Sequence, residues 1–125
     1  MKRDLDLYRA ILLAVESASE DNWGSDLDPE EFPNHTTEVV RHHVALLEDA
    51  GYLEVIDHIV GNNIIDTGRI THSGYDFLDA VRDELVWKKT KNAAESVGSF
   101  SISVLKDVAI GLAKSSLSQH LGVVV

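Results

Sequence analysis

The chain has 125 residues, of which 44% are hydrophobic and 26% charged, and it contains no cysteine. This length and composition predict one globular domain with its own core, and they exclude a disordered chain, disulfides and thiolate metal sites. The formal net charge is −10, all of it in residues 1–60, which carry fourteen acidic and four basic side chains. Such an acidic half repels phosphate groups at long range and so opposes nucleic-acid binding.

Hydropathy gives no sign of a membrane segment. No apolar run approaches the roughly 20 residues that a membrane-spanning helix needs. The basic start of the chain, MKRD, leads into an amphipathic stretch rather than the apolar block of a signal peptide. We therefore expect a cytoplasmic protein with no membrane partner.

Apolar residues at helical spacing predict a first helix over residues 5–17. They are Leu5, Tyr8, Ile11, Leu12 and Val15. Residues 22–34 contain both prolines, a glycine and several acidic side chains, so a loop with at most a short turn is predicted there. Trp23 and Phe32 are expected to anchor this loop to the core.

A second helix is predicted over residues 36–50. Thr36 can cap its start, because the hydroxyl can accept a backbone N–H that the first turn leaves free. Gly51 follows as the expected left-handed stop. The inward row of this helix is formed by Val40, Val44 and Leu47. His43, beside that row, is expected to be a hydrogen-bonded core or interface residue.

A hairpin is predicted next. Residues 52–60 are rich in β-branched and aromatic side chains, Gly61-Asn62-Asn63 is a turn signal, and residues 64–71 can return as the second strand. Thr67-Gly68 is expected to add a bend or a bulge within that strand.

Two more helices are predicted after the hairpin. Ser73 with Asp76 has the form of a capping box variant, and the helix that it starts can extend past Trp87. The apolar row of this helix is formed by Phe77, Leu78, Val81 and Leu85. Residues 93–98 are small and polar and predict a break. A last helix is predicted over residues 102–121.

The predicted fold class is mainly α with a β-hairpin (α+β). The order of elements, namely helix, loop, helix, hairpin, helix and helix, is typical of a winged helix-turn-helix-like domain with an additional C-terminal helix. We expect a single domain over residues 1–125, with its C-terminal helical extension at about 101–121. The second of the usual three helices has room for only about one turn, between residues 26 and 33.

Several segments resemble known proteins. Residues 42–53 (HHVALLEDAGYL) resemble the His-x-x-x-Leu-Leu-x-x-Ala-Gly-Leu-Ile pattern of winged-helix regulators, and residues 69–78 (RITHSGYDFL) resemble their Arg-Leu-Thr-x-x-Gly-x-x-Phe-Leu segment. With the opening MKRDLDL, residues 77–91 and residues 101–121, the chain resembles a family of small bacterial and phage-associated proteins catalogued only as a domain of unknown function. The resemblance implies the winged-helix fold and brings no activity with it.

DNA binding is the first functional hypothesis, with residues 36–50 as a recognition helix in the major groove. The candidate DNA-binding residues are Thr37, Arg41 and His42 in the helix, Asn62, Asn63 and Arg69 in the wing, and Lys88, Lys89 and Lys91 as a basic cluster. Arg41 is the main phosphate or guanine partner, while Thr37 and His42 can donate hydrogen bonds. Glu38, Glu48 and Asp49 on the same helix meet phosphates unfavourably. The asparagines are also ordinary turn formers, and the lysines also offset a helix dipole.

The predicted protein is therefore a small transcriptional regulator that binds double-stranded DNA without a cofactor. The alternative is an acidic protein–protein interaction module, an adaptor or inhibitor, which docks through its N-terminal half. The last helix carries more apolar surface than one contact face needs, which favours a homodimer.

Catalysis and metal binding have little support in the sequence. It contains no Gly-x-Ser-x-Gly, no phosphate-binding glycine loop and no His-Glu-x-x-His. His35, His42 and His43 lie close in sequence, but their spacing does not match that of a known set of three metal ligands. We therefore expect no enzymatic activity and no metal site.

Overall fold

The computed structural model describes residues 1–18, 25–55, 65–97 and 101–121. The chain divides into two compact units, Met1–Asp76 and Phe77–Val125, and each is described by itself. The prediction of a single domain stays a prediction. Within the described residues, no helix is both long enough and apolar enough to span a membrane.

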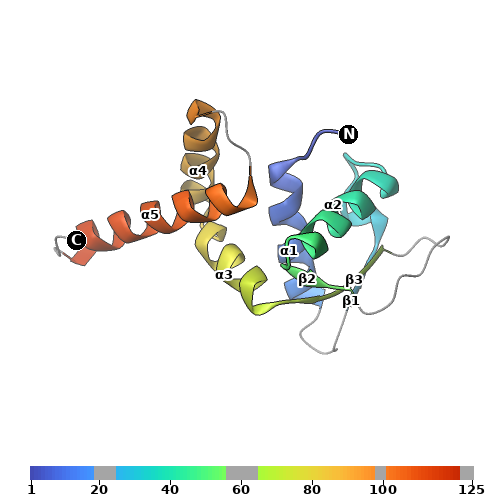
Figure 1. Cartoon of the computed structure of the whole chain (residues 1–125). Helices are drawn as coiled ribbons and strands as arrows, with labels where there is room; N and C mark the ends of the chain where they lie inside the picture. The colour runs from blue at the N-terminus through green and yellow to red at the C-terminus, as the bar shows by residue number, and fades with distance from the viewer. Residues whose placement is uncertain (19–24, 56–64, 98–100, 122–125) are drawn as a thin grey trace. The chain divides into compact units, whose positions relative to one another are not determined.

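Helix α1 (Leu5–Ala18) opens the first unit and confirms the predicted first helix. Asp4 caps it, because the backbone N–H of Leu7 donates to Asp4 Oδ1 at 3.2 Å. Leu5 is only half-buried. The buried face of the helix is formed by Leu7, Tyr8, Ile11, Leu12 and Val15. Helix α1 lies against the sheet and against helix α2 (Thr37–Asp49), and Figure 1 shows this arrangement of the elements.

The prediction of a loop with at most a short turn over residues 22–34 is wrong in one respect, because it missed a strand. Ser25–Leu27 form strand β1, whereas the short turn is present as the 3-10 turn η1, Pro29–Glu31. β1 pairs antiparallel with strand β3 (Ile65–Ile70). A strand of three residues is too short to show a period-two pattern, and its pairing partner lies about 40 residues away in the sequence. The prolines, the glycine and the acidic side chains therefore predicted a loop, and the strand was missed.

The turn η1 holds the chain between β1 and α2 close to the core. The backbone N–H of Glu30 donates to Asp28 Oδ1 at 2.9 Å, and that of Phe32 donates to the carbonyl of Pro29 at 3.1 Å. Phe32 is buried, as predicted. Trp23, the other predicted anchor, lies outside the described residues.

Helix α2 confirms the predicted second helix, with its cap and its stop. The backbone N–H of Val39 donates to Thr36 Oγ1 at 3.2 Å, which is the expected N-cap bond. Gly51 has φ +82°, the left-handed geometry expected of a glycine after a helix. The buried row consists of Val40, His43, Val44 and Leu47.

Three strands pair in the order β1-β3-β2, where β2 is Leu53–Glu54. The predicted irregularity at Thr67-Gly68 is confirmed, because the β1–β3 register shifts there and Gly68 has φ +63°. The predicted turn at residues 61–63 lies outside the described residues. With its helices and this small antiparallel sheet, the chain is confirmed as α+β.

Helix α3 (His72–Val81) begins two residues earlier than the capping-box prediction. Its cap is Thr71 rather than Ser73, because the backbone N–H of Gly74 donates to Thr71 Oγ1 at 3.0 Å. Thr71 directly follows β3, so the strand decides where the helix starts.

The predicted extension of this helix past Trp87 is wrong. α3 ends at Val81, and a new helix, α4 (Glu84–Val97), is capped by Asp83, whose Oδ1 accepts the N–H of Val86 at 2.9 Å. The restart rotates Leu85 out of the apolar row, and it is 61% exposed.

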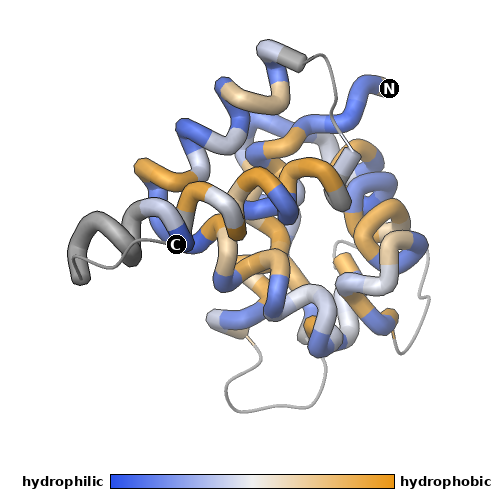
Figure 2. Tube along the Cα trace, turned by 60° about the vertical axis from the view of Figure 1, so that its left-hand side comes forward, coloured by the Kyte–Doolittle hydropathy of each residue, from blue (hydrophilic) through white to orange (hydrophobic). Residues whose placement is uncertain are grey.

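The second unit contains α4 packed against α5 (Ile102–Leu121). α5 confirms the predicted last helix. The break predicted at residues 93–98 is misplaced, because α4 continues through Val97. Residues buried in the two helices are Trp87, Thr90 and Ala94 in α4 and Leu105 and Ala109 in α5. In Figure 2 hydrophobic and hydrophilic residues alternate along the helices, the pattern of segments that bury one face.

Candidate nucleic-acid interface and the polar contacts around it

Helix α2 presents a stripe of exposed side chains on the side opposite its buried row. The stripe consists of Glu38, His42, Ala45 and Asp49. These positions are four, three and four residues apart, so they follow one face of the helix. The face that sequence reasoning selected for DNA contact is therefore exposed, and it combines one histidine with two carboxylates.

Two of the predicted groove-contacting residues flank this stripe. Thr37 and Arg41 are half-buried, whereas His42 is exposed. Thr37 and Arg41 are four residues apart and so share the same flank. Arg41 also takes part in an interaction within the chain. Of the three α2 candidates, only His42 therefore lies on the exposed stripe, while Thr37 and Arg41 lie beside it on one flank of the helix.

Arg69 already has a carboxylate partner. It lies directly opposite Glu54 in the antiparallel register of β2 and β3, and its Nη2 donates to Glu54 Oε2 at 2.6 Å. The two side chains are 34% and 57% exposed, so solvent weakens this ion pair. A phosphate would have to compete with Glu54 for the guanidinium. Sequence reasoning missed this pair because it depends on the strand register.

Glu48 has a structural contact that the sequence did not indicate. Its Oε2 accepts the backbone N–H of Val55 at 3.1 Å, just beyond the end of β2. The helical spacing placed Glu48 on the outward side of α2, and it is half-buried there. Its carboxylate therefore fixes the chain that leaves β2 rather than simply facing solvent.

The remaining candidates are separate from this face. Asn62 and Asn63 lie outside the described residues. Lys88 and Lys89 are exposed on α4 in the second unit, and Lys91 Nζ lies 5.6 Å from the centroid of the Trp87 ring. A cation over an aromatic face at this distance is held by the ring, so Lys91 is the least available of the three lysines.

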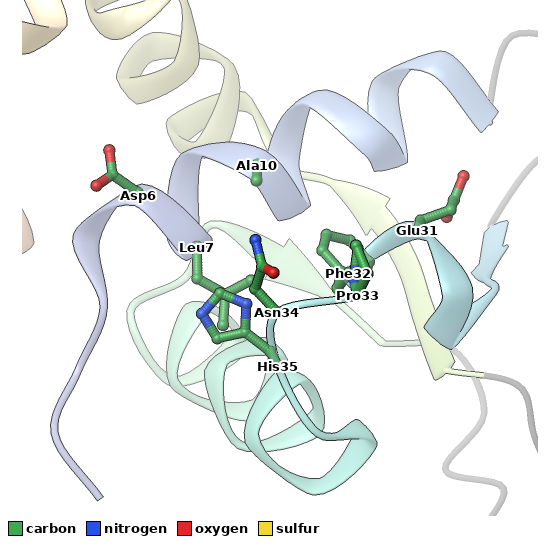
Figure 3. A pocket seen from close by; sticks show the side chains of 8 residues that line it. All are labelled: Asp6, Leu7, Ala10, Glu31, Phe32, Pro33, Asn34 and His35. Carbon is green, nitrogen blue, oxygen red and sulfur yellow. The ribbon is translucent and has the colours of Figure 1, made fainter.

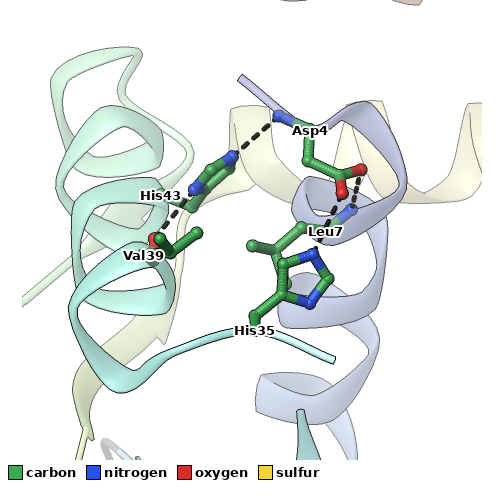
Figure 4. Close-up of polar contacts among 5 residues, drawn as sticks. All are labelled: Asp4, Leu7, His35, Val39 and His43. Atoms are coloured by element: carbon green, nitrogen blue, oxygen red, sulfur yellow. Dashed lines mark hydrogen bonds and ion pairs between the residues drawn. The ribbon is translucent and has the colours of Figure 1, made fainter. Parts of the chain in front are cut away.

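A polar cluster joins α1 to α2, as Figure 4 shows. His43 is completely buried, with Nδ1 at 2.8 Å from the Val39 carbonyl oxygen and Nε2 at 2.8 Å from the Asp4 backbone nitrogen. A carbonyl only accepts and a backbone N–H only donates, so Nδ1 carries the proton and Nε2 accepts. The neutral imidazole is thus satisfied at both nitrogens. This confirms His43 as a hydrogen-bonded core residue.

Asp4 is the centre of this cluster. Its Oδ1 caps α1 through Leu7, and its Oδ2 lies 3.0 Å from His35 Nε2. Sequence reasoning considered His35 only as a possible metal ligand. Within the described part of the chain, no three histidine, aspartate or glutamate side chains form a group that could hold a metal ion. The role that the contacts support is to hold the N-terminal residues against α2.

Tyr8 lies beside His43, with 5.2 Å between the two ring centroids. Its phenol predicts that the free energy of unfolding depends on pH. Burial raises the pKa of the Tyr8 phenol above its ordinary 10.0, and the charge of Arg3 lowers it part of the way back. Arg3 acts as a nearby charge, because the phenol oxygen has no hydrogen-bond partner of good geometry among the described residues. As pH rises above about 10, the unfolded chain loses this proton first, so the free energy of unfolding should fall.

Urea denaturation at several values between about pH 9 and pH 11 measures this effect. Tyr8→Phe is expected to lose less stability over that interval than the wild type, because it has no phenol to ionise. Tyr75→Phe, at an exposed tyrosine of α3, is the control and should follow the wild type. Equal slopes for the wild type and Tyr8→Phe would contradict the assignment.

Comparison with known proteins identifies relatives by sequence. A family model described as "Hypothetical protein (DUF2513)" matches residues 2–101, which include α1 to α4. A protein of Haemophilus influenzae described as "Uncharacterized protein" is 37% identical over 111 residues, which cover 87% of this chain and 92% of the relative. No solved structure matches the chain. The predicted resemblance to a domain of unknown function is confirmed.

Proposed function

The chain belongs to the family described as "Hypothetical protein (DUF2513)", and from the geometry of α2 we propose that it binds double-stranded DNA as a small winged-helix transcriptional regulator. The exposed stripe of α2 carries this proposal. A recognition helix needs one face packed on its domain and the other exposed and polar, with its first turns toward the bases. α2 meets these conditions, since Glu38 and His42 are exposed in its first half and Val40 and Val44 are buried.

The order of elements supports the same proposal. α2 is followed at once by β2, and β3 returns antiparallel beside it. A helix followed by two such strands is the arrangement in which a winged-helix domain presents its recognition helix and its wing. In the proposed complex Thr37, Arg41 and His42 probe the groove, and Arg69 contacts the backbone. Lys88, Lys89 and Lys91 add electrostatic attraction.

Electrostatics limits the affinity of this complex. The first unit carries sixteen acidic and five basic side chains, so its net charge repels DNA at long range. With only Arg41 and Arg69 as cationic contacts in that unit, about two phosphates are neutralised there. These two contacts should contribute a fall of about 2 in the logarithm of the binding constant for each tenfold rise in salt, and phosphate contacts of Lys88, Lys89 and Lys91 should steepen it.

Fluorescence anisotropy with labelled genomic DNA fragments at low salt tests DNA binding. Arg41→Ala is expected to weaken binding about tenfold or more, since it removes a base or phosphate contact. Glu54→Gln should strengthen binding, because it releases Arg69 from its ion pair. The two substitutions therefore shift affinity in opposite directions.

Arg82→Ala is the matched control, because it removes the same charge from a surface pair with Asp79 at 2.8 Å. It should bind DNA as the wild type does. DNA binding through α2 is refuted if the wild type fails to bind at low salt. Equal binding by the wild type, Arg41→Ala and Glu54→Gln would also refute it.

The proposal includes a homodimer and a cytoplasmic location. Val104, Val108, Ile110 and Leu112 of α5 are only half-buried within the chain, which leaves apolar surface for a second copy. Two copies would match the two half-sites of a palindromic operator. The mass of the free protein in solution, measured beside the binding experiment, should be twice 13.8 kDa.

Acidic charge favours a second candidate, a protein-interaction module. The first unit carries sixteen acidic and five basic side chains, a net charge that attracts a basic partner, and Arg69 is already paired with Glu54. If DNA does not bind at low salt while a basic protein segment does, this function replaces the first.

A further inference from the structure

A small apolar pocket lies between α1 and the segment that connects η1 to α2, as Figure 3 shows. Leu7 and Phe32, both buried, form its floor, and Ala10 and Pro33 form exposed parts of its wall. All of these residues belong to the first unit. The pocket is separate from the exposed stripe of α2, so it does not depend on the DNA-binding proposal.

The volume of the pocket decides what can fill it. Its volume is about 200 Å³, and it is open to solvent. Pockets for drug-sized molecules and cofactors measure roughly 300–1,000 Å³. A space of this size matches one large apolar side chain, such as leucine, methionine or phenylalanine. Partner proteins commonly bind through such an anchor residue in a well-packed pocket.

Two of the polar residues that line the pocket, Asp6 and Glu31, are acidic, and the other two are Asn34 and His35. Figure 3 shows Asp6 and Glu31 at opposite ends of the apolar floor. Glu30, the neighbour of Glu31 in η1, is also exposed. Carboxylates at both ends oppose an anionic ligand and complement a segment with positive charges before and after its anchor.

Local hydrogen bonds hold the pocket walls in place. The backbone N–H of His35 donates to the Phe32 carbonyl at 3.1 Å, and His35 Nε2 lies 3.0 Å from Asp4 Oδ2. The turn before Phe32 is closed by its own bond to Pro29. A pocket that is already formed saves the entropy of ordering on binding.

We propose that this pocket binds a basic segment of a partner protein. The segment inserts one apolar side chain between Leu7 and Phe32 and places lysine or arginine residues beside Asp6 and Glu31. Recognition therefore needs both the anchor and its flanking charges.

Fluorescein-labelled seven-residue peptides test the proposal with the full chain. The probes carry two lysines at each end and leucine, methionine or phenylalanine at the centre, and a matched peptide carries serine there. At least one apolar-centred peptide is expected to bind at least tenfold more tightly than the serine peptide, as burial of one large apolar side chain requires. Equal affinities for all four peptides, or no binding at all, overturn the proposal.

Protein variants locate the site. Ala10→Trp places a bulky ring in the pocket from an exposed position, so the fold should persist, which circular dichroism checks. It should weaken binding of the tightest-binding peptide about tenfold. Glu31→Gln should weaken the same binding about threefold. Glu38→Gln removes the same charge from α2 and is the control, with no expected change. Binding that is equally sensitive to Glu31→Gln and Glu38→Gln, and insensitive to Ala10→Trp, would show general charge attraction and overturn the assignment.

Discussion

Replacing Gly68 by alanine is expected to lower the free energy of unfolding by about 3–5 kcal/mol. Two effects add. Gly68 has φ +63°, which an L-residue with a side chain rarely adopts. A Cβ atom there would also overlap the backbone carbonyl oxygen of Glu54 and lie 2.8 Å from Val55 Cα. These are backbone atoms, so no side-chain rotation relieves the overlap, and β2 must move away from β3.

Two other glycines separate these effects in the same urea denaturation experiment. Gly51 also has positive φ, but nothing lies within 4 Å of an added Cβ, so Gly51→Ala should cost only about 1 kcal/mol. Gly111, inside α5, has open space and ordinary helical geometry, so Gly111→Ala should stabilise by about 0.5–1 kcal/mol. If Gly68→Ala costs no more than Gly51→Ala, the close approach of β2 to β3 is wrong.

Local signals explain which elements the sequence predicted correctly. The Thr36 cap, the Gly51 stop and the apolar row between them lie within one helix, and each acts over at most four residues. The irregularity at Gly68 was likewise visible as a glycine inside a strand. α1 and α5 were recovered from periodicity alone. These features depend on the nearest neighbours along the chain, which a sequence displays directly.

Non-local pairing explains what was missed. β1 exists because its three residues pair with β3, and Thr71 rather than Ser73 caps α3 because β3 ends there. Asp83 divides one predicted helix into two through a cap that competes with continued helix. At the candidate site, the partners of Glu48 and Arg69 are set by where β2 lies. Such choices between similar local options depend on tertiary contacts.

The carboxylates that contribute to the net charge of −10 differ in what they contact. Three carboxylates near α1, α2 and β2 have defined partners: Asp4 caps α1, Glu48 holds Val55, and Glu54 pairs with Arg69. Glu30 and Glu31, by contrast, are exposed beside the pocket. Backbone N–H groups carry no formal charge, so Asp4 and Glu48 stay negative near the proposed recognition helix and still oppose DNA at long range. The exposed acidity at η1 suits a basic partner, so both proposals can hold for one molecule.

Replacing His43 by alanine is the second substitution with a large expected effect, a loss of about 2–4 kcal/mol in the free energy of unfolding. The imidazole is fully buried, so its removal leaves a cavity beside the Tyr8 ring. It also leaves the Asp4 N–H without its acceptor. His43→Phe keeps most of the volume and removes only the hydrogen bonds, so it should lose about 1–3 kcal/mol.

His42→Ala provides the control, since His42 is the next residue and is exposed. It should change stability by no more than about 0.5 kcal/mol. Amide hydrogen exchange gives a second measurement, because the Asp4 N–H that His43 accepts at 2.8 Å should exchange at least about tenfold faster in both His43 variants. If His43→Ala and His42→Ala are equally stable and Asp4 exchanges at the wild-type rate, the N-terminal residues are not held to α2 by this histidine. A slow Asp4 amide in the wild type and a fast one in His43→Phe would establish that the link is the hydrogen bond itself rather than the packing of the ring.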